Sequence, residues 1–295
     1  MSLFREVSGL VRIAGSLSKA HITLPVTAST FTGYFVYTAS LTPELPLLLL
    51  GVFLLAAGSS ALNHFQERRI DALMERTKNR PLPGKQVSPG FVILFSAVLL
   101  STGSLLLFLH FSPSVVLLGI FNFIWYNAVY TPLKKITAFA VIPGSITGGV
   151  PPLIGWVAAG GHWLHPWIII IVIFFFVGQI PHFWLLLLRY GKEYEKAGMP
   201  SLTGIFTPVQ LKRISCYWIA AAATASALLP ASGLISNRAL IVVWLAAIAM
   251  LVLSGLYHIK RKEAYGSRVP FMALNIFYLV IMILLSAEAA IKNGI

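Results

Sequence analysis

The 295-residue chain is 57% hydrophobic and only 11% charged, with a mean hydropathy of +0.83. Soluble domains carry about 25% charged residues, so this chain cannot cover itself with a water-compatible surface. The net charge of +13 does not indicate nucleic-acid binding, because Lys and Arg accumulate in cytoplasmic loops of membrane proteins. The single Cys216 excludes an internal disulfide and any Cys-based zinc or iron–sulfur site.

Residues 1–20 form an amphipathic N-terminal segment, which we expect on the cytoplasmic side. Its pattern fits a short helix lying on the membrane surface, and a solvated tail fits equally well. Apolar residues recur there at helical spacing opposite Arg5, Arg12 and Lys19; they are Leu3, Phe4, Val7, Leu10, Val11, Ala14 and Leu17.

Nine apolar segments follow, each near the length that crosses about 30 Å of hydrocarbon as a helix. Short segments of alternating polarity, typical of a transmembrane barrel, do not occur. We therefore predict an all-α, polytopic membrane protein, with residues 1–295 as one domain and nine transmembrane helices around a central cavity. The expected spans are 21–40, 45–66, 90–110, 113–132, 138–159, 166–189, 212–230, 239–258 and 270–290.

The distribution of positive charge predicts the orientation of these spans. Of the 22 Lys and Arg residues, all but Arg238 and Lys292 fall on one side of a nine-span arrangement. Basic loops remain in the cytoplasm. We therefore expect a multi-pass protein of the cell (inner) membrane with a cytoplasmic N-terminus and an external C-terminus.

The first polar cluster lies at the end of the second span. Asn63, Glu67 and Asp71 are spaced four residues apart and share one helix face. Hard oxygen ligands suit Mg²⁺, which typically takes one or two carboxylates together with substrate phosphates. Arg76 and Arg80 follow, and guanidinium groups bind phosphate oxygens. The cluster predicts a Mg²⁺–diphosphate site, although acids that only pair with neighbouring arginines would give the same spacing.

Two further clusters are expected on the same membrane side. Tyr126, Tyr130 and Lys134, with Lys135 beside it, could supply hydroxyls and cations to a diphosphate, or could be interfacial anchors and topological lysines. His182 lies within an apolar span, seven residues before Arg189 on the same helix face. An intramembrane polar residue is a functional candidate, but a His beside a Pro also serves to bond a freed backbone carbonyl.

In the order and spacing of these clusters, the chain resembles the intramembrane aromatic prenyltransferases. Among them it resembles the heme O synthases. Asn63, Glu67 and Asp71 match the first polar motif of that superfamily, although Asp is usual where Glu67 stands, and Glu193 lies in the second acidic stretch. The narrower resemblance is carried by Tyr130-Thr131-Pro132-Leu133-Lys134-Lys135, Pro151-Pro152-Leu153-Ile154-Gly155-Trp156, Pro181-His182-Phe183, Glu193-Tyr194 and Ala197-Gly198-Met199-Pro200.

The resemblance implies transfer of a farnesyl group from farnesyl diphosphate to a vinyl group of heme B within the bilayer. It implies Mg²⁺ on Asn63, Glu67, Asp71 and Glu193. Heme A synthase and terminal oxidase assembly factors are candidate partners. Diphosphate would bind Arg76, Arg80, Lys134, Lys135, Tyr126 and Tyr130, and heme would bind Lys19, His182 and Arg189.

Two other functions remain open at this point. Another member of the same superfamily would prenylate an aromatic acid, a quinone precursor or a different tetrapyrrole. A transporter or heme carrier would perform no chemistry, but transporters place polar groups near the bilayer midplane. Here the acids and bases gather at one interface, which favours an enzyme acting on a cytoplasmic diphosphate.

Overall fold

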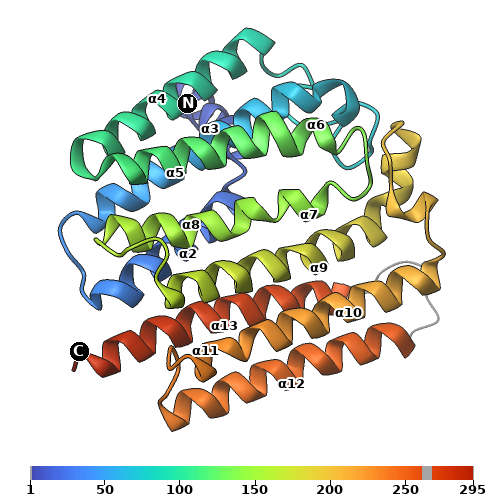
Figure 1. The fold of residues 1–295 in the computed structure, drawn as a ribbon. Helices are drawn as coiled ribbons and strands as arrows, with labels where there is room; N and C mark the ends of the chain where they lie inside the picture. The colour runs from blue at the N-terminus through green and yellow to red at the C-terminus, as the bar shows by residue number, and fades with distance from the viewer. Residues whose placement is uncertain (1, 261–267, 295) are drawn as a thin grey trace. The chain divides into compact units, whose positions relative to one another are not determined.

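The computed structural model describes residues 2–260 and 268–294, and those residues form helices and connecting turns with no strand (Figure 1). The all-α prediction is therefore confirmed. The chain divides into two compact units, which alternate along the sequence. The first comprises Met1–Ala28 and Pro43–Pro132, and the second comprises Ser29–Thr42 and Leu133–Ile295.

The first unit is organised around the long helix α3. Its helices are α1 (Ser2–Ser18), α3 (Leu45–Asp71), α4 (Pro89–His110) and α5 (Pro113–Ile124), and α5 continues into the π-helix η1 (Trp125–Tyr130) and the short α6 (Thr131–Leu133). Small residues let α3 and α4 approach closely, as is usual between membrane helices. A Cβ atom on Gly103 would lie 2.9 Å from the Gly51 carbonyl oxygen, and the Ser96 hydroxyl donates to the Gly58 carbonyl at 2.7 Å.

The amphipathic N-terminal segment is helical, as one of the two sequence interpretations expected. In α1, Leu10 and Val11 are 60% and 66% exposed, whereas Leu17 is fully buried. Leu17 packs in a small apolar cluster with residues of α3 and α4, including Ala61 and Val92. One side of α1 is thus packed within the unit, and the exposed Leu10 and Val11 are compatible with the predicted contact with lipid.

The second unit contains the end of α2 (Ala20–Thr38) and the remaining helices. They are α7 (Val141–Gly144), α8 (Ile146–Ala158), α9 (Pro166–Lys196), α10 (Pro208–Ser226), α11 (Leu228–Ala231), α12 (Arg238–Lys260) and α13 (Arg268–Lys292), with a 3₁₀ turn at Leu202–Gly204. Helices α9, α10, α12 and α13 run side by side (Figure 1). Fully buried Phe174 and Phe277 meet edge to face in this core.

The Pro-Pro-Leu-Ile-Gly-Trp motif is a packing element of this unit. A Cβ atom on Gly155 of α8 would lie 1.9 Å from the Thr30 carbonyl oxygen of α2, and one on Gly33 would lie 1.9 Å from the Pro152 carbonyl oxygen. Each glycine therefore allows a close approach of two helix backbones, which any side chain at that position would prevent. The physical role of the motif in this structure is close contact between α2 and α8.

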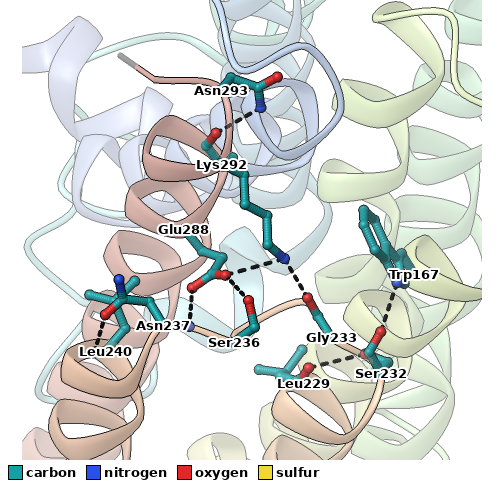
Figure 2. A network of polar contacts seen from close by, with 11 residues as sticks. Trp167, Leu229, Ser232, Gly233, Ser236, Asn237, Leu240, Glu288, Lys292 and Asn293 are labelled. Atoms are coloured by element: carbon teal, nitrogen blue, oxygen red, sulfur yellow. Dashed lines mark hydrogen bonds and ion pairs between the residues drawn. The ribbon is translucent and has the colours of Figure 1, made fainter.

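A polar network joins α13 to the turn between α11 and α12 (Figure 2). The buried Glu288 carboxylate accepts hydrogen bonds from the Ser236 hydroxyl and from the Asn237 backbone N–H at 3.0 Å. Lys292 lies 3.2 Å from that carboxylate and donates to the Gly233 carbonyl at 2.6 Å. The carboxylate thus stabilises the N-terminus of α12 and holds the turn against α13.

Within the described residues, eight helical segments are long and apolar enough to cross a membrane. They correspond to eight of the nine expected spans, and the protein is a multi-pass membrane protein. The ninth, α2, is a 19-residue helix with five threonines and lies outside that set, so the count of nine stays a prediction. The central cavity and the single-domain organisation also stay predictions.

Candidate functional site

The last two turns of α3 carry the predicted acidic face. Asn63 and Asp71 are each only 1% exposed, and Glu67 between them is partly buried. The helix ends at Asp71, where the chain enters a series of turns that continues to α4. An amide and a carboxylate buried in a membrane protein are costly unless they have partners, so their partners define what the site can do.

Asp71 is held by the turn that follows its own helix. Nη1 of Arg80 contacts both carboxylate oxygens of Asp71, at 2.9 and 2.8 Å. The fully buried Thr77 donates its hydroxyl to the Asp71 backbone carbonyl at 2.8 Å. The turn therefore brings the Arg80 guanidinium into direct contact with the Asp71 carboxylate, nine residues earlier in the sequence.

Asn63 joins the N-terminal segment to the π-helix. Nζ of Lys19 donates to Oδ1 of Asn63 at 2.6 Å, and Nδ2 of Asn63 donates to the Thr131 hydroxyl at 3.1 Å. Lys19 is only 8% exposed and has a φ of 47° at the junction of α1 and α2. The structure thus places Lys19 at the amide of the predicted metal site. Its role toward a heme carboxylate stays a prediction.

The second predicted cluster is interrupted by a change of helix type. The rings of Tyr126 and Tyr130 lie 5.6 Å apart within η1. Asn127 turns toward α3 instead, where its Nδ2 donates to the Ser59 hydroxyl at 2.6 Å. Its backbone carbonyl accepts from Gln66 at 3.0 Å. A π-helix introduces an extra residue into the helical repeat. Tyr126, Tyr130 and Lys134 therefore do not share one helix face as residues four positions apart would in a regular α-helix.

The remaining candidates belong to the second unit. Lys134 and Lys135 follow the short α6, while His182, Arg189 and Glu193 lie along α9. Helix α9 continues to Lys196, seven residues beyond the predicted end of the span, so Arg189 and Glu193 are helical. The His182 ring packs against Phe271 of α13, with ring centroids 4.8 Å apart. The ligand roles of these residues stay predictions.

The residues of the first unit fit Mg²⁺ only if a bound substrate supplies some of the ligands of the metal ion. No group of three or more His, Cys, Asp or Glu side chains in the described parts of the chain is arranged to hold a metal ion. Asn63, Glu67 and Asp71 offer an amide and two carboxylates, which matches the few protein ligands that Mg²⁺ uses beside phosphates. Cationic groups of Lys19 and Arg80 already contact Asn63 and Asp71, so this face attracts positive charge.

Apolar helices, with a buried amide and a buried carboxylate that contact cationic side chains at the end of α3, define a multi-pass membrane protein with a polar cluster at one helix end. Comparison with known proteins identifies the group more closely. The chain belongs to the UbiA prenyltransferase family, whose sequence model matches residues 26–281.

Relatives and solved structures agree with this family. The chain is 42% identical over 208 residues to the protoheme IX farnesyltransferase of Geobacter sulfurreducens, covering 70% of this chain and 75% of that one. It is 34% identical to the protoheme IX farnesyltransferase of Oleidesulfovibrio alaskensis, over 97% of this chain and 99% of the other. A UbiA homolog from Archaeoglobus fulgidus, solved with GPP and Mg²⁺, shares the fold with a TM-score of 0.70 and 16% identity, over 96% and 100% of the two chains.

Sequence reasoning assigned no role to three residues of the site: Ser59, Asn127 and Thr131, the last of which was quoted only within the motif at residues 130–135. Ser59 and Asn127 hydrogen-bond each other, and Thr131 contacts Asn63. Asn127 within a predicted span was a usable signal, because polar residues in membrane helices are functional candidates. Thr131 gave no such signal, since threonines are scattered through the chain.

Proposed function

We propose that this protein transfers a farnesyl group from farnesyl diphosphate to a vinyl group of heme B, giving heme O. The prenyltransferase activity rests on membership of the family. The heme substrate is supported by relatives that bear the name protoheme IX farnesyltransferase and match most of the chain. The observation that carries the proposal is the largely buried cluster at the end of α3, where Arg80 contacts Asp71 and Lys19 contacts Asn63.

This cluster has the charges that a metal–diphosphate site requires. Asn63, Glu67 and Asp71 would hold Mg²⁺ together with the substrate phosphates, and the Archaeoglobus homolog likewise binds GPP and Mg²⁺. Arg80 would bind diphosphate oxygens while remaining beside Asp71, since guanidinium groups have several donors. We propose the same role toward diphosphate for Arg76, Tyr126, Tyr130, Lys134 and Lys135, and metal binding for Glu193.

The chemistry begins with cleavage of the bond between the allylic carbon and the diphosphate oxygen. Diphosphate leaves with the electron pair, and Arg80 stabilises the charge that develops on it. A bound Mg²⁺ supplies further positive charge at the same place. The allylic cation then bonds to one vinyl carbon of heme B, and water adds to the other carbon and releases a proton. Apolar walls delay the reaction of the cation with water.

The heme acceptor is assigned to residues of the second unit. We propose His182 as a ligand of the heme iron and Arg189 as a partner of a heme propionate. His182 lies beside the aromatic ring of Phe271, in surroundings suited to a flat apolar ligand. Any interaction with heme A synthase or with oxidase assembly factors stays a prediction.

The activity is tested by the mass of the heme product. Purified protein is incubated with heme B, farnesyl diphosphate and Mg²⁺, and the extracted heme is analysed by mass spectrometry. We expect heme heavier by one farnesyl group and one hydroxyl, with one diphosphate released for each product. A heme carrier would bind heme without releasing diphosphate. Prenylation of an added aromatic acid but not of heme would identify a different member of the family.

We also propose that the protein lies in the cell (inner) membrane with its N-terminus in the cytoplasm and its C-terminus outside. The charge asymmetry supports this orientation. In a variant with Cys216 replaced by Ser, a single cysteine introduced at position 75 should be labelled by an impermeant reagent only after the cells are opened, and one at position 292 should be labelled in intact cells. Labelling of both positions in intact cells would contradict the orientation.

A further inference from the structure

We propose that Thr131 is a positioning residue. It orients the amide of Asn63 so that the side-chain oxygen, and not the nitrogen, is offered to a bound Mg²⁺. This inference rests on the proposed function, because it assumes that Asn63 binds the metal–diphosphate complex. It concerns a residue for which the sequence offered no role. The relevant contacts all lie within the first unit.

The first step is the direction of the Asn63 amide. The Lys19 ammonium has only donors, so the atom of Asn63 that it contacts at 2.6 Å is the acceptor oxygen. The amide nitrogen then faces Thr131, 3.1 Å from its hydroxyl oxygen.

The second step is the direction of the Thr131 hydroxyl. It donates to the backbone carbonyl of Tyr126 at 2.8 Å, which leaves its lone pairs for the Asn63 amide. The same Tyr126 carbonyl accepts the backbone N–H of Thr131, which is the five-residue bond of a π-helix. The Thr131 hydroxyl is therefore fixed by the backbone of η1 and cannot readily turn its proton toward Asn63.

The third step is burial. Asn63 and Thr131 are each only 1% exposed, so water cannot replace a missing hydrogen bond without rearrangement. An amide that lost the Thr131 acceptor would leave a buried N–H group unsatisfied, which is costly. Rotation by 180° about the terminal torsion would then be opposed only by the Lys19 contact, and that rotation would turn the nitrogen to the place where a metal ion needs the oxygen. The hydroxyl thus favours the one orientation in which Asn63 can be a metal ligand.

The test compares Thr131→Val, which keeps the shape and removes the hydroxyl, with Thr131→Ser, which keeps the hydroxyl. We expect Thr131→Val to raise the Mg²⁺ concentration for half-maximal rate by about three- to tenfold, the effect of one neutral hydrogen bond, with an unchanged KM for heme. Thr131→Ser should be close to the wild type. Thermal unfolding in detergent confirms that both variants are folded. Equal Mg²⁺ requirements in the two variants would overturn the inference.

Binding gives a readout that does not depend on turnover. With farnesyl diphosphate present and heme absent, bound Mg²⁺ should raise the Tm of the protein, because a ligand that binds only the folded state stabilises it. The Mg²⁺ concentration that gives half of this rise should be higher for Thr131→Val and unchanged for Thr131→Ser. A shift of the same size in both variants would contradict the positioning role.

A second comparison uses Asn63→Asp, whose two carboxylate oxygens are equivalent and need no orientation. In that background, Thr131→Val should raise the Mg²⁺ requirement no further, and a full additional increase would refute the positioning role. Asn63→Ala separates the two proposals. If Asn63→Ala needed no more Mg²⁺ than the wild type, Asn63 would not belong to the proposed site. If Asn63→Ala needed much more Mg²⁺ but Thr131→Val did not, only the role of Thr131 would be rejected.

Discussion

Replacement of Asp71 by Asn is expected to lower the rate of heme farnesylation by about 100- to 1000-fold, the effect of removing one group that stabilises charge in a transition state. The side chain keeps its shape but loses the charge that would attract Mg²⁺. Turnover is measured by diphosphate release at saturating heme and farnesyl diphosphate. Glu75→Gln is the matched control, because Glu75 is exposed and pairs with Lys78, three residues later in the turns after α3, at 2.6 Å.

The partly buried ion pair between Asp71 and Arg80 gives another explanation for a loss of activity, namely a loss of folding, and this explanation must be excluded. Asp71→Asn leaves the Arg80 guanidinium without its carboxylate. Because the Arg80 side chain is 23% exposed, the loss of stability should be smaller than the roughly 3–5 kcal/mol found for fully buried pairs. The double variant Asp71→Asn with Arg80→Gln removes both charges. If the pair serves only stability, this variant should recover folding and activity together. We expect it to recover thermal stability while the activity remains lost.

The second large effect is expected for Arg80→Gln, with a loss of about ten- to a hundredfold in kcat/KM for farnesyl diphosphate. A hydrogen bond to a charged group contributes about 1.5–3 kcal/mol, and Arg80 is proposed to contact diphosphate both before and during bond cleavage. The KM for farnesyl diphosphate should therefore rise as kcat falls. The variant also tests whether the guanidinium serves the substrate or only Asp71.

Lys78→Gln provides the control for charge alone. Lys78 lies in the same turn, but its side chain is 46% exposed and pairs with Glu75 at the surface. Exposed ion pairs contribute about 0–1 kcal/mol, so this variant should keep normal kinetics. If Arg80→Gln and Lys78→Gln showed the same small change in the KM for farnesyl diphosphate, the basic residues of this turn would act as topological signals and not as ligands.

Much of the architecture could be predicted because the bilayer restricts the choice of structure. Backbone groups in lipid must be satisfied within the segment, so each long apolar stretch had to be a helix. The observed α3, α4 and α12 begin and end within about five residues of the expected spans. The shared face of Asn63, Glu67 and Asp71 followed from the helical repeat alone.

The partners of those residues could not be predicted, because they depend on how separate helices pack. The heme-binding role of Lys19 stays a prediction, but its contact with Asn63, 44 positions away in the sequence, was not predicted. Glu288 was not singled out, although it holds the turn before α12. Neither contact has a sequence spacing that helical periodicity could reveal, since each joins elements distant along the chain.

The sequence by itself determined that this is a helical membrane protein, because hydropathy, charge asymmetry and the four-residue spacing on α3 are local properties, and the prenyltransferase type followed only from the resemblance of its motifs to those of a known family. Only the tertiary structure decided which cations meet Asn63 and Asp71 of α3. It also revealed the π-helix at Trp125–Tyr130, which turns Asn127 toward Ser59 and brings Thr131 to Asn63. An extra residue in a helical turn leaves the apolar pattern almost unchanged, whereas its effect on side-chain direction appears only when a neighbouring helix is in place.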